Sequence, residues 1–213
     1  MNNNERNVPA VVIRRLPRYY RYLGQLLKEG IQRISSGDLS EKMSVTASQI
    51  RQDFNYFGGF GQQGYGYNVE YLYNEIGEIL GLNDGDTTII IGAGNLGTAL
   101  ANQDNFEKRG FTLIGLFDNS PEVIGTTVHG NVVMSIDNLE EFLSKNHVDI
   151  AILTVPKSEV ESIADRLINA GVKGLMNFSY IELSESENIA IENIHLSDSL
   201  MMLSYKIKQK GNV

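Results

Sequence analysis

The sequence predicts an α/β chain of two domains followed by a single helix, and three observations support this prediction. The chain has 213 residues, which suits two small domains better than one, because domains typically hold about 100 to 150 residues. Residues 1–82 contain amphipathic helical segments and a glycine-rich hairpin, whereas residues 83–195 alternate apolar strands with helices. Residues 196–213 then add one more helical segment with an apolar side.

Composition excludes several classes of site. The chain has no cysteine, which excludes disulfides, thiolate nucleophiles and cysteine-ligated zinc. No histidine or carboxylate cluster has metal-ligand spacing, so no metal is expected. Apolar runs stay well short of the roughly 20 residues that span a bilayer, which predicts a cytoplasmic protein with no membrane partner.

Charge is divided unevenly along the chain. The net charge is −8, but residues 1–60 carry nine Lys and Arg against five acids, a net +4. The remaining residues carry a net −12. Lys and Arg neutralise phosphates in nucleic-acid complexes, so the basic part is the candidate for binding DNA.

The first domain begins with helical patterns. Apolar residues recur at three- and four-residue intervals from Val12 to Ile31, and Pro17 indicates that a helix begins there or is kinked. Ser35 and Asp38 have capping-box spacing before a short helix over residues 37–43.

A third helix follows over about residues 46–56. Thr46 is a suitable N-cap, and Gln49, three residues later, is placed to reach back to the backbone of Thr46. Ile50, Phe54 and Phe57 form the apolar face. The polar face holds Ser48, Arg51, Gln52 and Asn55.

These helices are typical of a helix-turn-helix, whose second helix enters the major groove. Arg reads guanine and Gln or Asn reads adenine there, so Arg51, Gln52 and Asn55 are the base-reading candidates. Residues 57–67 then alternate aromatic residues with glycines about a turn at 62–64, as expected of a wing hairpin. The first domain is therefore predicted to be a winged helix-turn-helix.

The second domain opens with a dinucleotide-binding pattern. The buried strand Thr87–Ile91 leads directly into the motif Gly92-Ala93-Gly94-Asn95-Leu96-Gly97 and then a helix. The first glycine makes the turn, the second admits a pyrophosphate, and the third packs helix against strand. A second strand ends at Asp118, 21 residues after Gly97, where a carboxylate favours NAD(H) over NADP(H).

Further strands complete a Rossmann-like, doubly wound parallel sheet. Strand candidates lie at 148–156 and 172–177, and Ser158 with Glu161 predicts a capping box for the helix between them. Ligands of such sheets lie at the carboxyl ends of the strands. The residues expected near the nicotinamide half are therefore Thr154, Val155, Pro156, Asn177 and Phe178.

Six segments resemble the Rex family of redox-sensing transcriptional repressors. They are Arg14 to Leu23, Arg51 to Gly58, Gly64 to Tyr67, Gly92 to Gly97, Leu153 to Pro156 and Lys173 to Phe178. The resemblance implies a homodimer with swapped C-terminal helices that binds NADH and NAD+ and releases palindromic operator DNA when NADH binds. The DNA contacts then expected are Arg14, Arg15, Arg18, Thr46, Ser48, Arg51, Gln52, Asn55, Tyr56, Gly58, Gln62, Gln63 and Gly64.

The chain also departs from that family. Gln52, Gln62 and Gln63 stand where much of the family has basic residues, which predicts a weaker salt dependence of DNA binding. Some members couple the two sites through an arginine, a tyrosine and an aspartate; Arg21 is retained here, but the other two positions correspond to Gln103 and His195.

Two alternatives to a repressor stay open at this point. One is a small NAD-dependent oxidoreductase, although no substrate domain or proton-transfer motif is visible, so a non-enzymatic role is expected. The other is a module for a different adenine nucleotide such as coenzyme A, which Asp118 does not exclude.

Overall fold

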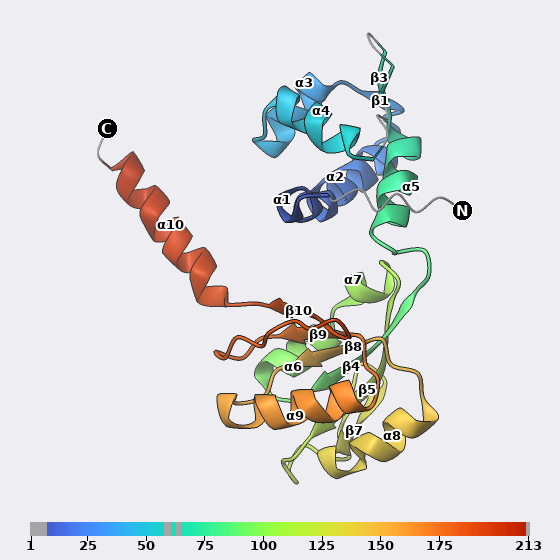
Figure 1. Ribbon diagram of the computed structural model, residues 1–213, viewed down its shortest axis with the longest axis vertical. Coiled ribbons are helices and arrows are strands. Elements are labelled where there is room, and N and C mark those ends of the chain that lie inside the picture. The colour runs from blue at the N-terminus through green and yellow to red at the C-terminus, as the bar shows by residue number, and fades with distance from the viewer. Residues whose placement is uncertain (1–7, 58–60, 63–64, 212–213) are drawn as a thin grey trace. The chain divides into compact units, whose positions relative to one another are not determined.

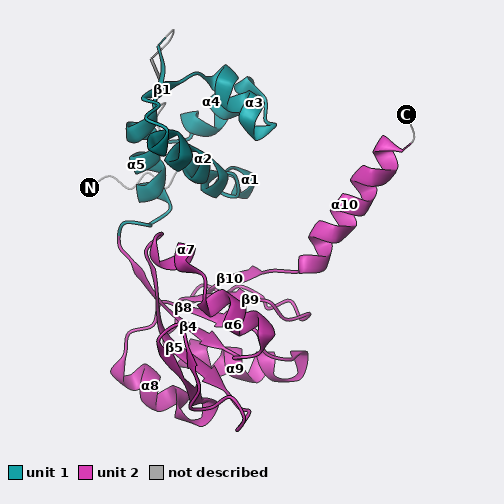
Figure 2. Ribbon diagram, turned by 180° about the vertical axis from the view of Figure 1, so that it is seen from behind, with its two compact units in different colours: residues 1–83 teal, residues 84–213 magenta. Residues whose placement is uncertain are grey.

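The computed structural model describes residues 8–57, 61–62 and 65–211, and the chain forms two compact units, residues 1–83 and 84–213 (Figure 2). Among these described residues, no helix is long and apolar enough to cross a membrane.

Unit 1 is built from five helices and a small sheet within its described residues. The helices are α1 (Ala10–Ile13), α2 (Leu16–Lys28), α3 (Ser36–Met43), α4 (Ala47–Asn55) and α5 (Val69–Ile79). Pro17 lies in the first turn of α2, where its missing N–H has no cost, so the long apolar pattern is divided into α1 and α2. One side of α2 is buried through Leu16, Tyr19, Leu23 and Leu26.

Side-chain caps fix the two helices of the helix-turn-helix. The predicted capping box is confirmed: the Ser35 hydroxyl accepts from the Asp38 backbone N–H, and the Asp38 carboxylate accepts from that of Ser35. Thr46 caps α4 by accepting from the backbone N–H of Gln49. The expectation for the Gln49 side chain was wrong, because its amide instead donates to Asp53 at 2.9 Å.

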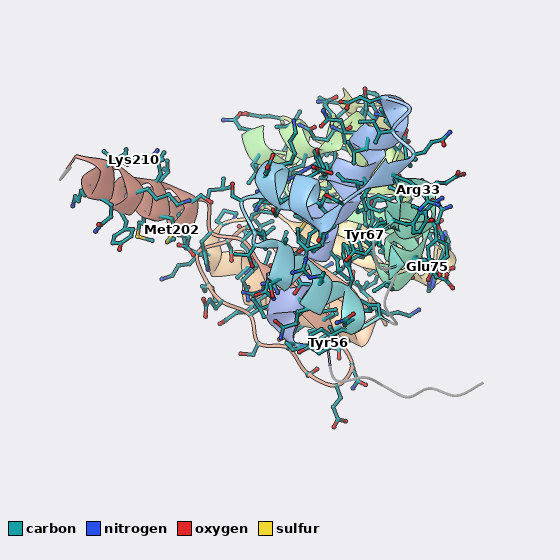
Figure 3. The ribbon with its side chains drawn as sticks, turned by 90° about the horizontal axis from the view of Figure 1, so that it is seen from above. Arg33, Tyr56, Tyr67, Glu75, Met202 and Lys210 are labelled. Carbon is teal, nitrogen blue, oxygen red and sulfur yellow. The ribbon has the colours of Figure 1, made fainter. Side chains whose placement is uncertain are left out.

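The wing is an antiparallel sheet of β1 (Arg33–Ile34), β2 (Gly61–Gln62) and β3 (Gly66–Asn68), in the order β1-β3-β2. Gly66 has φ +69°, and a Cβ there would lie 2.7 Å from the Ile34 carbonyl oxygen, so only glycine fits this close approach. Tyr67 is buried and meets the Phe54 ring edge-on at 5.1 Å, which ties the wing to α4. Figure 3 shows Tyr67 and Arg33, which belong to the neighbouring strands β3 and β1.

Unit 2 contains a seven-stranded sheet in the order β10-β9-β8-β4-β5-β7-β6. The strands are β4 (Asp86–Ile91), β5 (Phe111–Asp118), β6 (Thr127–Val128), β7 (Asn131–Ser135), β8 (Ile150–Leu153), β9 (Gly174–Asn177) and β10 (Ala190–Asn193). All neighbours are parallel except β6 and β7. The strand order reverses at β4, and ligands of doubly wound sheets bind beyond the carboxyl ends of the strands at such a point.

Helices cover both faces of this sheet (Figure 1). They are α6 (Asn95–Ala101), α7 (Asp104–Glu107), α8 (Leu139–Lys145) and α9 (Lys157–Asn169), with a 3-10 turn over Ile136–Asn138. Ile89 and Ile91 pack in the core with α8 and α9, whereas Ile90 packs in the core with α6. Successive residues of β4 thus serve opposite faces, which is why the strand has no polar alternation.

The start of α9 differs from the prediction. The Ser158 capping box does not form, because the N-cap is Pro156, two residues before Ser158, and the helix that begins at Lys157 has no side-chain cap. The ring of Pro156 fixes its φ at −58°, and the chain enters α9 at the next residue.

The last helix, α10 (Leu196–Lys210), is exposed along its whole length. Its apolar side chains are 52% to 68% exposed. They are Leu196, Leu200, Met201, Met202, Leu203, Tyr205 and Ile207. Figure 3 shows Met202 and Lys210 on this helix.

Candidate functional site

The glycine loop between β4 and α6 gives each of its three glycines a different role. Gly92 has φ +101°, and a Cβ there would lie 2.8 Å from the Thr154 carbonyl oxygen. A Cβ at Gly97 would overlap the carbonyl oxygen of Gly92. Gly94, the N-cap of α6, is exposed and has open space where a Cβ would stand. The loop therefore presents bare backbone at the positive end of a helix, which suits a pyrophosphate.

Asp118 ends β5 and holds this loop. Its carboxylate accepts from the backbone N–H of Ala93 at 2.6 Å and from that of Ser120 at 2.8 Å. Each oxygen retains a further lone pair, so the group is still able to accept from ribose hydroxyls.

A pocket of about 300 Å³ lies where the strand order reverses. Six of the predicted residues line it: Gly92, Gly94, Asp118, Thr154, Val155 and Pro156. The remaining lining residues were not predicted: Ile91, Asn119, Ile136, Glu159 and Ile163. Its apolar side chains suit a flat adenine ring, and its polar groups gather near Asp118.

Three predicted pocket residues have structural roles. The Thr154 hydroxyl donates to the Gly92 carbonyl oxygen at 2.7 Å, so it helps to hold the glycine loop in place. Asn177 is fully buried, and its amide bonds to Ile181, Asn193 and Ser179. Phe178 packs in the core that contains α6. Asn177 and Phe178 do not line this pocket, and their contact with the nicotinamide half stays a prediction.

The other predicted loop residues, Ala93, Asn95, Leu96 and Gly97, do not line the pocket with their side chains. Ala93 and Gly97 are buried within the turn, and Asn95 opens α6. Their contacts with a dinucleotide stay a prediction, in which the backbone N–H groups of the loop are the donors.

The polar face of α4 is exposed as predicted. Ser48, Arg51, Gln52 and Asn55 are exposed, and Tyr56 follows as the C-cap. Arg51 donates to the Ser36 hydroxyl at 2.8 Å, which holds the guanidinium beside the start of α3. Arg14 and Arg18 are exposed on the preceding helices, and the Thr46 hydroxyl is used as the cap of α4.

Asp53, on the inner side of α4, was missed by the sequence analysis. Its side chain has 0% exposure, and its carboxylate accepts four hydrogen bonds. Arg15 donates two of them, both at 2.7 Å, Tyr19 donates one at 2.8 Å and Gln49 the fourth at 2.9 Å. The helix α4 is thus held against the start of α2 through the buried charge of Asp53.

This network changes the interpretation of Arg15. We expected a DNA contact, but its guanidinium is only 22% exposed and two of its N–H groups are bonded to Asp53. Positioning α4 is the role that its contacts support.

Electrostatics agree with this assignment. Burial alone would raise the pKa of Asp53, but hydrogen bonds from Arg15, Tyr19 and Gln49 outweigh it, so this pKa lies below its ordinary value. Burial and the bond to Asp53 raise the pKa of Tyr19. Asp53 is therefore ionised at neutral pH, and Tyr19 is the hydrogen-bond donor.

Four of the predicted DNA contacts belong to the wing. Gly58, Gln63 and Gly64 lie outside the described residues, and Gln62 is described only as part of the backbone of β2. Their contacts with DNA stay predictions, as does the coupling role of Arg21, Gln103 and His195.

Two family models match the chain. The model described as "Putative DNA-binding protein N-terminus" matches residues 7–55, and that described as "CoA binding domain" matches residues 83–181. These ranges fall in units 1 and 2 respectively.

Whole-chain relatives are similar over both units. Proteins named redox-sensing transcriptional repressor Rex are 56% identical over 95% of this chain and 91% of the relative in Caldanaerobacter subterraneus subsp. tengcongensis. The protein of the same name in Clostridium novyi (strain NT) is 52% identical over 94% of this chain and 96% of its own length.

Solved structures agree. RSP in complex with β-NAD+ and operator DNA has a TM-score of 0.89, at 54% identity over 96% of this chain and 94% of that one. RSP in complex with β-NADH has a TM-score of 0.88, at 51% identity over 96% of each chain. The chain therefore belongs to the Rex family of redox-sensing transcriptional repressors.

Proposed function

We propose that this protein is a transcriptional repressor that binds palindromic operator DNA and releases it when NADH binds. The observation that carries this function is the presence of a DNA-binding unit and a dinucleotide-binding unit in one chain. Unit 1 presents the polar face of α4 beside a wing, and unit 2 presents a glycine loop and a carboxylate at a strand-order reversal. The relatives solved with NAD+, NADH and operator DNA support the same pairing of ligands.

DNA is read by α4 in this proposal. Arg51, Gln52 and Asn55 contact base edges, while Arg14 and Arg18 contact phosphates. Further contacts complete the interface: Ser48, Tyr56, Gly58, Gln62, Gln63 and Gly64. Arg15 and Thr46 position α4, the first through Asp53 and the second as its cap.

NADH and NAD+ occupy the pocket of unit 2. Backbone N–H groups at Gly94 and Asn95 face the pyrophosphate, Asp118 accepts from the adenosine ribose, and Val155 and Pro156 face the apolar part of the ligand. No lining residue in the described chain is a histidine, lysine or tyrosine, which favours sensing over hydride-transfer catalysis. We accordingly propose a cytoplasmic regulator without enzymatic activity.

A homodimer follows from α10 in this proposal. Seven large apolar side chains exposed on one helix are costly in water and are typical of a surface that a second chain covers. Exchange of α10 between two copies is the arrangement that the family resemblance implies. Light scattering of Leu200→Glu, Leu203→Glu protein tests it: the variant is expected to be monomeric, and an unchanged dimer would contradict the role of α10.

Two single substitutions test the two readers separately. Arg51→Ala is expected to weaken operator binding at least tenfold while NADH affinity is unchanged. Gly94→Ala is expected to weaken NADH binding at least tenfold, leave operator affinity unchanged and abolish release by NADH. The probe is a palindromic duplex selected by the protein from random-sequence DNA, and Glu41→Gln, on the exposed surface of α3, is the control. Loss of both operator binding and NADH binding in either variant would contradict two separate binding sites.

A further inference from the structure

The rim of the dinucleotide pocket carries a second carboxylate beside Asp118. Glu159 lies in the first turn of α9 and lines the pocket. Its two oxygens accept from the amide of Asn119 at 3.2 and 3.4 Å. Asn119 directly follows Asp118, so this bond connects α9 with the end of β5, where the adenosine ribose of a dinucleotide is recognised.

The charged side chains that line the pocket are both acidic. Asp118 and Glu159 are its only ionisable residues among the described part of the chain, and no lysine or arginine lines the pocket. Lys157, on the same helix as Glu159, is exposed and does not line it. The pyrophosphate of a ligand meets backbone N–H groups at the start of α6, but a further phosphate on the ribose meets no cation.

We propose that Glu159, together with Asn119, is a specificity determinant that rejects adenine nucleotides bearing a phosphate on the adenosine ribose. The inference rests on dinucleotide binding in this pocket, as proposed above. Carboxylates only accept hydrogen bonds, so the pair Asp118 and Glu159 suits the two donor hydroxyls of an unmodified ribose. The same pair repels a 2′-phosphate, as in NADPH, and a 3′-phosphate, as in coenzyme A.

Glu159 is the better residue to vary than Asp118. Asp118 bonds to Ala93 and Ser120 and so fixes the glycine loop, and removing its charge would disturb the site itself. Glu159 is bonded only to the Asn119 amide in the described contacts, and glutamine retains an oxygen that accepts from that amide. Glu159→Gln therefore removes charge with little change of shape.

Calorimetric titration of the full chain with NADH, NADPH and coenzyme A tests the proposal. Wild-type protein is expected to bind NADH and to discriminate against NADPH. Glu159→Gln is expected to narrow the ratio of NADH to NADPH affinity about tenfold, as removal of one charge near a dianion implies. Glu161→Gln, an exposed acid on the same helix that does not line the pocket, is expected to leave the ratio unchanged.

Salt separates charge repulsion from a structural effect. Raising NaCl from about 0.05 M to about 0.5 M is expected to lower the ratio of NADH to NADPH affinity in the wild-type protein, because salt screens the repulsion. The decrease is expected to be smaller in Glu159→Gln, which has less repulsion to screen. A ratio in Glu159→Gln within twofold of wild type would overturn the inference, as would coenzyme A binding as tightly as NADH to wild-type protein. Absence of NADH binding to wild-type protein would instead contradict the proposed function.

Discussion

Replacing Asp53 by asparagine removes the buried charge that fastens α4 to α2. The oxygen Oδ2 accepts from Arg15 and Tyr19, and Oδ1 accepts from Arg15 and Gln49. An asparagine amide keeps one oxygen and turns two N–H groups toward the donors that faced the other. At least two of the four hydrogen bonds are therefore lost in either orientation.

The magnitude follows from these bonds. A hydrogen bond to a charged group contributes about 1.5 to 3 kcal/mol, and breaking a buried ion pair costs about 3 to 5 kcal/mol. Arg15 is 22% exposed and regains some hydration, so we expect the free energy of opening of α4 to fall by about 3 kcal/mol. That change accelerates amide exchange about 150-fold.

Hydrogen-exchange mass spectrometry of the full chain measures this change in the segment from Thr46 to Tyr56. Segments of unit 2 provide the internal reference, and Glu41→Gln, exposed on α3, provides the control variant. Exchange of the α4 segment within twofold of wild type in Asp53→Asn would refute the role of the network.

Three further predictions concern pH, the glycine loop and the DNA interface. The pKa of Asp53 is lowered by folding, so its stabilisation is present above the ordinary carboxyl pKa of about 3.9 and is lost as pH falls through the lower folded value. Amide hydrogen exchange of α4 should therefore accelerate at acidic pH in the wild-type protein, whereas in Asp53→Asn acid should cause no further acceleration. Equal acid sensitivity of the two proteins would count against this role of Asp53. Gly97→Ala should lower the thermal midpoint of the unliganded protein, because its Cβ overlaps Gly92, whereas Gly94→Ala should leave it unchanged in calorimetry; equal midpoints would contradict the assigned roles. Arg18→Ala should weaken binding to all DNA sequences alike and reduce the slope of log affinity against log salt by about 1, and a sequence-selective loss would disagree.

Local signals in the sequence were sufficient for much of the fold. Ser35, Asp38 and Thr46 cap the helices that they were expected to cap, because these bonds span only three residues. The glycine motif was found for a similar reason, since strand, turn and helix are contiguous.

Long-range partners were not visible in the sequence. Asp53 meets Arg15 and Tyr19, which are 38 and 34 residues away, and no local pattern pairs them. The one available signal was helical phase, because Asp53 stands three residues after Ile50 and beside Phe54, where an acid needs a partner. Asn177 was predicted to contact the ligand from its position at the end of β9, and the sequence did not show that its amide donates to Ile181 and Asn193.

Short and irregular elements were also missed. They are the strands β6, β7 and β10 and the helix α8, of which β6, with two residues, is too short to show a period. Glu159 was overlooked because its neighbour Asn119 is 40 residues away and comes from another strand end. Pocket walls assembled from separate strand ends therefore require the three-dimensional structure.

A single titration measures whether NADH binding in unit 2 is coupled to operator binding in unit 1. Fluorescence anisotropy of a labelled palindromic duplex bound to the protein is followed while NADH, and separately NAD+, is added. We expect release by NADH at concentrations where NAD+ has little effect, with operator affinity lowered about 5- to 150-fold at saturation. Operator affinity unchanged by saturating NADH would contradict it.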